Sequence, residues 1–484
     1  MMLLYSIFFI ILILLVLFGI AVINAIRLKK DYVNGKPYDT EKDGINPEKH
    51  AKNLSEMIQI PSVSVRGNSD LTYIYKMHEK LEELYPLIHS RLEKTDIDGA
   101  LLYRWKGKNP DRLPILLMSH HDVVEATGEW KYPAFSGTIA EGKIWGRGAI
   151  DTKGALCAIL ESVEYLLSIG FTPSCDVYIA SSCNEEITGD GAVKTVDYLY
   201  KKGIKFELVM DEGGSVMGDM LGSNAQTAMV GIFEKGRANI KFIANSHGGH
   251  ASIPFKNNPF ARLAKLIDRI ETRPPFKKKI TAPVKRMYKE MVPYMPFKYR
   301  LVLGNLWLFG WILPLVMSKM GGQANALVST TCVFTQAKGS NGANVIPEEA
   351  SVTANMRFMI HEPLEPSLKK VLKIAQRYDI WMEMISGYDI PPVANMNTYA
   401  YRQVIKQIKD TFGDIPVIPY VMLAGTDARH YTKICDCVLR FVPLTMSDAQ
   451  MKSAHAVNEN LDVASLSRAV KFYVDFIRHY DNTQ

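Results

Sequence analysis

Two adjacent glutamates, Glu185 and Glu186, stand in the segment SCNEEITG at residues 182–189. Neighbouring side chains on an extended segment point to opposite sides, so two such carboxylates are expected to do different work. One can bind a metal ion while the other faces a water molecule as a general base. The pair therefore suggests hydrolysis by a metal-activated water.

Further metal-ligand residue types occur in two segments upstream of this pair. His120 and Asp122 lie two apart in LLMSHHDVV, so on an extended segment both project to the same side. His120 can then bind a metal ion and Asp122 can orient its imidazole, while His121 faces the other side and is expected to be structural. Asp151 lies in the glycine-rich turn GRGAIDTKG, where the backbone can approach the site closely and a carboxylate can bridge two ions.

Two segments downstream add a carboxylate and an imidazole. VMDEGG contains Asp211 and Glu212, and SAHAVNENL contains His455. Taken singly, an acidic residue after a strand is more often a helix cap or a solvated charge. Five such segments in one chain, placed as they are, favour a two-metal hydrolytic site.

Alternating strand and helix patterns predict the elements that position these residues. Strands are expected at residues 100–105, 114–119, 175–181, 206–210 and 435–441, and helices at 48–60, 71–85, 154–167, 193–201 and 399–412. This alternation is typical of an α/β fold with a mainly parallel sheet. His120, Glu185 and Asp211 each come just after one of these strands. Open α/β sheets bind ligands at that edge, which supports a site there.

The order of predicted strands and helices changes over residues 236–387. Strands at 238–244, 329–338, 350–358 and 380–386 and helices at 259–271 and 364–377 give a β-α-β-β-α-β (ferredoxin-like) unit. We therefore expect a catalytic domain at residues 45–235 and 388–484, with the unit at 236–387 inserted as a second domain.

The bulk composition excludes some classes of protein. The chain has 484 residues, 47% of them hydrophobic, and a formal net charge of +7. That charge is scattered, so nucleic-acid binding is not indicated. The six cysteines show no zinc-finger or disulfide spacing and are expected to be reduced and structural.

The N-terminal 26 residues contain no charged side chain and are long enough to span a membrane as a helix. No basic residue precedes the apolar run, whereas Arg27, Lys29 and Lys30 follow it, unlike a cleaved signal peptide. Residues 1–28 are thus expected to form a single-pass anchor, with the catalytic domain in the cytoplasm by the positive-inside rule. An exported domain remains the alternative.

A second apolar stretch covers residues 301–317 and is broken by Gly304, Asn305, Gly310 and Pro314. A second transmembrane helix is not expected from so interrupted a run. The main expectation is a buried helix pair. The alternatives are an apolar wall for a hydrophobic substrate and a monotopic membrane contact.

The five segments together resemble the zinc-dependent family of aminoacylase, carboxypeptidase S and succinyl-diaminopimelate desuccinylase. The resemblance runs from about residue 48 to the C-terminus, and DEGG is most similar to the carboxypeptidase S and N-fatty-acyl-amino-acid hydrolase branch. It implies two zinc ions, with cobalt or manganese as alternatives. The metal ligands that it implies are His120, Asp151 as the bridge, Glu186, Asp211 and His455, with Glu212 as the alternative to Asp211. Asp122 is then the supporting acid and Glu185 the general base.

The resemblance also assigns residues outside the metal site. His250 in SHGGHASIP resembles a histidine that stabilises the oxyanion, often from the partner subunit of a dimer, so a homodimer is implied. The substrate-binding residues that it implies are Asn344, Arg357, Asp427 and Arg429. One departure is Asn184, where many relatives have aspartate before the glutamate pair, but it is not a ligand by the match.

The expected activity is hydrolysis of an amide bond next to a free carboxylate, in an N-acyl amino acid or a short peptide. The membrane anchor and the apolar insertion favour an acyl-chain substrate. The alternatives are a dipeptidase or carboxypeptidase of the same family and a non-catalytic, membrane-tethered binding protein. The last would be expected to have lost a ligand or the base, and none is missing.

Overall fold

A large central sheet forms the body of the protein. The computed structural model describes residues 2–31, 35–36, 45–218 and 226–480. Four parallel strands lie side by side in the middle of this sheet, in the order β6 (Val177–Ser181), β3 (Ile115–Met118), β7 (Leu208–Asp211) and β17 (Val438–Arg440). Strands β2 (Ala100–Trp105) and β1 (Glu93–Ile97) extend it on one side; β9 (Thr227–Glu234), β16 (Val417–Met422), β8 (Val216–Met217) and β18 (Thr445–Met446) extend it on the other. The expected α/β fold with a mainly parallel central sheet is confirmed.

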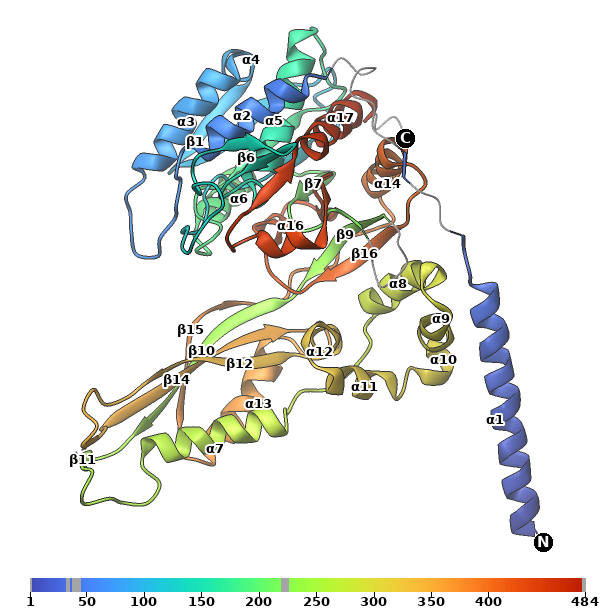
Figure 1. The fold of residues 1–484 in the computed structure, drawn as a ribbon, viewed down its shortest axis with the longest axis vertical. Helices are drawn as coiled ribbons and strands as arrows, with labels where there is room; N and C mark the ends of the chain where they lie inside the picture. The colour runs from blue at the N-terminus through green and yellow to red at the C-terminus, as the bar shows by residue number, and fades with distance from the viewer. Residues whose placement is uncertain (1, 32–34, 37–44, 219–225, 481–484) are drawn as a thin grey trace.

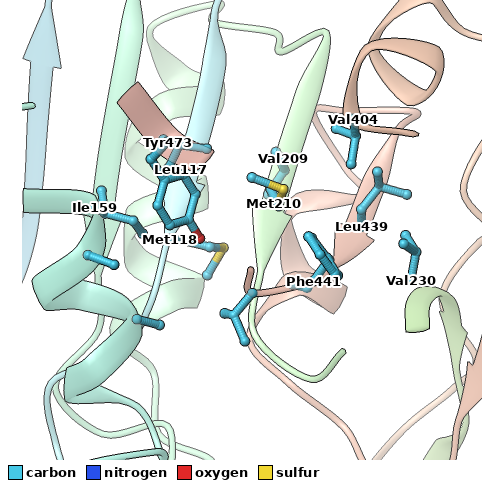
Figure 2. Close-up of a cluster of buried hydrophobic side chains, with 14 of the residues drawn as sticks. Leu117, Met118, Ile159, Val209, Met210, Val230, Val404, Leu439, Phe441 and Tyr473 are labelled. Atoms are coloured by element: carbon cyan, nitrogen blue, oxygen red, sulfur yellow. The ribbon is translucent and has the colours of Figure 1, made fainter. Parts of the chain in front are cut away.

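Helices cover this sheet and enclose its core. One packed group consists of α2 (Pro47–Ile58), α4 (Pro86–Arg91), α5 (Lys153–Ser168), α14 (Tyr399–Phe412) and α17 (Val463–His479), with α3 (Thr72–Leu84) against α2 and α4. Figure 2 shows Ile159 of α5 and Tyr473 of α17 next to Leu117 and Met118 of β3. Such burial of apolar area is the main force that holds strands and helices together. A second group, α6 (Gly191–Lys201), α15 (Ala428–Tyr431) and α16 (Asp448–Ser453), follows strands β6, β16 and β18 along the chain.

A separate four-stranded sheet lies beside the central one (Figure 1). Its strands stand in the order β12 (Thr331–Lys338), β14 (Glu349–Phe358), β10 (Gly236–Asn245) and β15 (Trp381–Tyr388), and all three pairings are antiparallel. Helices α7 (Pro259–Thr272) and α13 (Leu364–Gln376) contact this sheet and share a hydrophobic core with it. Along the chain the elements run β10, α7, β12, β14, α13 and β15.

An insertion between α7 and β12 forms a chain of short helices. These are α8 (Ala282–Met291), the 3₁₀ helix η1 (Val292–Tyr294), α9 (Phe297–Leu303), α10 (Leu306–Phe309), α11 (Leu313–Met320) and α12 (Gly322–Val328). The expected buried helix pair at 301–317 is wrong, because Trp307, Trp311, Leu315 and Val316 keep much of their surface exposed. Glycine and proline interrupt the run, so it forms short helices instead of a pair of longer ones.

The N-terminal helix α1 (Met2–Arg27) projects from the body at the insertion (Figure 1). Among the described residues it is the one helix long and apolar enough to cross a membrane.

Several elements were not expected from the sequence. They include strands β9 and β16, helix α4, which follows the expected helix α3, and helix α17, which packs along α5. Two small sheets were also missed: β4 (Thr138–Ala140) with β5 (Lys143–Trp145) and β19 (Asn460–Asp462), and β11 (Gly249–His250) with β13 (Val345–Ile346). Strands of two or three residues are too short for a readable alternation of polar and apolar positions.

His50 makes the packing of α2 against α5 and α17 sensitive to acid. Its Nδ1 atom lies 3.3 Å from Ser467 Oγ of α17, and its Nε2 atom lies 3.8 Å from Glu161 Oε2 of α5. Burial and the neighbouring Lys49 charge lower the pKa of His50 to about 4. A histidine with a depressed folded pKa contributes stability above its unfolded pKa and loses it as the pH falls.

We therefore expect the free energy of unfolding to fall by roughly 2 kcal/mol between pH 7 and pH 5 through His50 alone. Urea unfolding of the detergent-solubilised protein at both pH values measures this difference. A His50→Gln variant should show a smaller difference, whereas His479→Gln, at an exposed position of α17, should match the unsubstituted protein. Equal differences in all three proteins would contradict the role of His50.

Candidate metal centre

His120 and Asp151 meet at the carboxyl edge of the central sheet. His120 follows β3, and its Nε2 atom lies 3.2 Å from Asp151 Oδ1. The second oxygen of Asp151, Oδ2, lies 2.9 Å from His455 Nε2. One carboxylate thus faces two imidazoles, which is the arrangement that a bridging ligand between two metal ions requires.

Glu186 completes the side of the site that contains His455. Its Oε2 atom lies 3.0 Å from His455 Nε2. The other oxygen, Oε1, is buried and has no hydrogen-bond partner within the part of the chain that the structure describes. A buried carboxylate oxygen without a partner is costly, so this atom is suited to a cation.

Glu212, not Asp211, reaches the other side of the site. Glu212 Oε1 lies 3.4 Å from His120 Nε2, and ligand atoms of His120, Glu185 and Glu212 lie within 4.8 Å of one another. Asp211 is the last residue of β7, and its Oδ2 atom accepts a hydrogen bond of 2.9 Å from the backbone N–H of Ala428. Because successive side chains alternate along a strand, the residue after Asp211 faces the site. The geometry therefore favours Glu212 over Asp211 as a ligand.

Asp122 connects His120 to the glutamate pair. It is fully buried, and its Oδ1 atom lies 3.3 Å from His120 Nδ1. The same carboxylate accepts hydrogen bonds from the backbone N–H groups of Glu185, at 3.1 Å, and Glu186, at 3.2 Å. Asp122 thus fixes both the imidazole and the turn that separates the two glutamates.

The charges of the site indicate that it is built for cations. Burial raises the pKa of Glu212 to about 7, and burial also raises the pKa of Glu185 well above its ordinary value. Hydrogen bonds to Asp151 and Glu186 raise the pKa of His455 to about 10. Four carboxylates and two imidazoles in one cluster form an oxygen- and nitrogen-rich donor set that zinc accepts. The residues present therefore fit a pair of divalent metal ions.

Glu459 is a functional residue that the sequence analysis missed. Its fully buried carboxylate accepts backbone hydrogen bonds from Gly148, at 3.1 Å, Ile150, at 2.8 Å, and Asp151, at 3.1 Å. Arg147 also donates to it, at 2.7 Å. Glu459 lies four residues after His455, so it connects the segment that contains His455 to the turn that contains Asp151. The sequence offered no signal for this role beyond an acidic residue close to a histidine.

Replacing Glu459 with glutamine (Glu459→Gln) is expected to weaken metal retention by roughly 10–100-fold. An amide would place an NH₂ group against backbone donors that now share two carboxylate oxygens, and leave at least one of them unsatisfied. Competition of the purified protein with a chelator measures the loss. Asp462→Asn, at a half-exposed acid three residues later at the end of β19, is the control and should retain metal normally. Equal retention by both variants would contradict the role of Glu459.

Two of the expected substrate-binding residues lie close to the cluster. Asp427 is buried and accepts a hydrogen bond from the hydroxyl of Ser182, the residue after β6. The Arg429 guanidinium lies over the Tyr388 ring, 4.5 Å from its centroid.

Arg357 interacts electrostatically with Arg429 and with Arg237. It is half-buried on β14, and burial lowers its pKa while the charges of Arg237 and Arg429 act in the same direction. Arg237 in turn donates to the Thr188 hydroxyl at 3.2 Å, across the junction of the two sheets. Positive charges therefore gather where the second sheet meets the glutamate loop.

His250 and Asn344 are not brought to the cluster. His250 is exposed on β11. The residue after it, Ala251, donates its backbone N–H to the backbone carbonyl of Asn344. Strand β11 lies at the end of the second sheet that is remote from the central sheet (Figure 1).

A cavity of about 240 Å³ opens beside the candidate ligands. Asp151, Glu185, Glu186, Glu212 and His455 line its polar end. Its remaining wall is largely apolar and includes Met422, Val442, Met446, Met451 and Ala454. No described residue of the stretch 301–317 contributes to this wall, so the insertion is not the apolar wall of this cavity.

Comparisons with known proteins agree with this geometry. A family model described as peptidase family M20/M25/M40 matches residues 116–479. An N-fatty-acyl-amino acid synthase/hydrolase from Danio rerio is 30% identical over 452 residues, which cover 90% of this chain and 87% of that protein. A probable carboxypeptidase S-like protein from Dictyostelium discoideum is 33% identical over 412 residues, which cover 84% of this chain and 79% of that protein.

A solved structure shows the same fold. The M20 family metallo-carboxypeptidase from Sulfolobus solfataricus superposes with a TM-score of 0.65 at 20% identity, and the match covers 89% of this chain and 99% of that one.

Proposed function

Because the chain belongs to peptidase family M20/M25/M40 and is a metal-dependent hydrolase, we propose that it hydrolyses N-acyl amino acids with long acyl chains. The bond cleaved is the amide next to the free carboxylate of the amino acid. The observation that carries this choice is the cavity beside the metal ligands, whose wall of methionine, valine and alanine suits a hydrocarbon chain. The Danio rerio relative, named for N-fatty-acyl amino acids, supports the same substrate class.

The proposed ligands are His120, Asp151 as the bridge, Glu186, Glu212 and His455, with Asp211 left as a residue that holds Ala428. Zinc bound there, or cobalt or manganese in its place, would polarise a water molecule and the substrate carbonyl.

Glu185 is the proposed general base. Its carboxylate lies within 4.8 Å of ligand atoms of His120 and Glu212 and lines the cavity, so it would face both the water and the scissile bond. Its raised pKa suits a carboxylate that accepts a proton from the attacking water and then delivers it to the leaving amine. Asp122 holds the Glu185 backbone N–H and thereby keeps the base at a fixed distance from the ligands.

The free carboxylate of the substrate is proposed to bind the positive charges at the junction of the two sheets. The candidates are Arg357 on β14 of the second sheet and Arg429 on α15, with Arg237 in the same group of charges. A planar guanidinium can hold a carboxylate with two parallel hydrogen bonds. Asp427, bonded to Ser182, would fix the position of the Arg429 segment.

Residues 236–387 are proposed to act as a lid and dimerisation domain on the catalytic domain of residues 45–235 and 388–484. The remote position of β11 supports this idea, because His250 and Asn344 are then available to the site of a partner subunit (Figure 1). In that arrangement His250 would stabilise the oxyanion in a homodimer.

Helix α1 is proposed to anchor the protein in a membrane, with the catalytic domain in the cytoplasm. Its length and apolar surface support the anchor, and the basic residues Arg27, Lys29 and Lys30 at its end support the orientation.

A hydrolysis screen tests the substrate class. Long-chain N-acyl amino acids should be cleaved faster than dipeptides, and their carboxyl methyl esters should be poor substrates. A Met451→Glu variant should lose turnover of long-chain substrates selectively, because it places a charge in the apolar wall, whereas Met451→Leu should retain it. Preferential cleavage of dipeptides would instead support the second candidate, a carboxypeptidase or dipeptidase, which the Dictyostelium discoideum relative favours.

A further inference from the structure

The insertion has an apolar outer face that differs from the surface of an ordinary soluble protein. Trp311 is 77% exposed and Met320 is 73% exposed, and Trp307, Leu315 and Val316 lie on the same run of helices. Large contiguous apolar patches on a protein surface mark contacts with proteins or membranes.

The inner face of α11 is packed against the body. Leu313 and Met317 are buried, and the hydroxyl of Tyr288 in α8 lies 3.7 Å from Met317 Sδ. Helix α11 is therefore held against the body on one side while Leu315 and Val316 point outward. A helix built only for a soluble core would have polar residues at these outer positions.

The insertion is joined to the base of α1 by specific polar contacts. Asn24 donates to Asn305 Oδ1 at 2.9 Å, and the fully buried Asn305 donates to the carbonyl of Ala21 at 3.0 Å. Arg300 donates to the carbonyl of Ala25 at 2.9 Å. Helices α9 and α10 consequently lie beside the C-terminal end of α1 (Figure 1).

The charges of the insertion are also asymmetric. Residues 282–320 contain one acidic residue, Glu290, against six basic ones: Lys285, Arg286, Lys289, Lys298, Arg300 and Lys319. Basic residues combined with exposed tryptophan and leucine are typical of segments that lie in the interface of an anionic bilayer.

We propose that helices α9 to α11 form a second, monotopic contact with the membrane, lying in the anionic leaflet beside the end of α1. The contact rests on the proposed anchoring by α1. Trp307 and Trp311 would enter the boundary between headgroups and acyl chains, where tryptophan is favoured. The body would thereby be held at a fixed orientation on the bilayer surface.

Tryptophan quenching in nanodiscs tests this contact with the full-length chain. Discs made from phosphatidylcholine and phosphatidylglycerol with brominated acyl chains should quench fluorescence relative to unbrominated discs. The double variant W307F/W311F should lose most of this quenching. W381F is the matched control, because Trp381 is 70% exposed on β15 of the second sheet and should not contribute.

The outcomes separate the proposed contact from the other proposals. Protein that co-elutes with discs but shows the same quenching in W307F/W311F as in the unsubstituted chain would overturn the contact and leave the anchor intact. Protein that does not co-elute with discs would overturn both. Hydrolysis of N-acyl amino acids in detergent is measured on the same samples and reports on the proposed enzyme activity independently.

Discussion

Replacement of Glu185 by glutamine is expected to lower kcat by roughly 10²–10⁴-fold, the usual contribution of a positioned general base. Glutamine has nearly the same shape but cannot accept a proton from the attacking water. The proposed substrate contacts lie elsewhere, at the apolar cavity wall and at Arg357 and Arg429, so KM should change little. Steady-state hydrolysis of a long-chain N-acyl amino acid measures both quantities.

The neighbouring acid Asp190 provides the control for Glu185. It lies in the same segment, is exposed, and forms an ion pair of 2.9 Å with Lys194. Asp190→Asn should retain the kcat of the unsubstituted protein. A Glu185→Gln protein with normal kcat, or with a change in KM alone, would contradict the assignment of the base.

Removing the metal is expected to bring hydrolysis down to background and to lower stability. Without cations, Glu212 and Glu185 are buried next to other carboxylates, which is why their pKa values rise. A ligand present at a thousand times its Kd stabilises the folded state by about 4 kcal/mol, so the melting temperature should fall on chelation and return with zinc. Activity and thermal unfolding, measured before and after dialysis against a chelator, show whether both effects are reversible.

Substitutions of the two candidate carboxylates at the end of β7 should have different effects on metal content and activity. Glu212→Gln should lose metal and activity together, because its carboxylate lies beside His120. Asp211→Asn should keep both, because an amide oxygen can still accept the N–H of Ala428. The reverse result would restore Asp211 as the ligand.

Much of the catalytic half of the fold could be predicted from the sequence. The strands before His120 and Glu185 are short, apolar and separated by helical patterns, and parallel strands of this kind place their carboxyl ends at one edge. The choice between Asp211 and Glu212 could not be made in this way. It depends on the residue at which β7 ends, and strand boundaries are the least certain part of a sequence-based prediction.

Other features depend on contacts between distant segments, which no local pattern reports. Glu459 accepts hydrogen bonds from the backbone of a turn about 310 residues earlier in the chain, and its importance comes entirely from that contact. The insertion presents a similar problem, since its composition is that of a buried helix. Only the packing shows that Leu313 and Met317 face inward while Trp311 remains exposed.

The most direct test of the metal-and-base account is the metal content of the inactive Glu185→Gln protein. The base is not a ligand in this account, because His120, Asp151, Glu186, Glu212 and His455 would hold the ions without it. Elemental analysis of the purified variant should therefore find the same zinc content per chain as in the unsubstituted protein, together with a kcat lowered by roughly 10²–10⁴-fold. Zinc lost along with the activity would make Glu185 a ligand and would contradict the division of labour between the two adjacent glutamates.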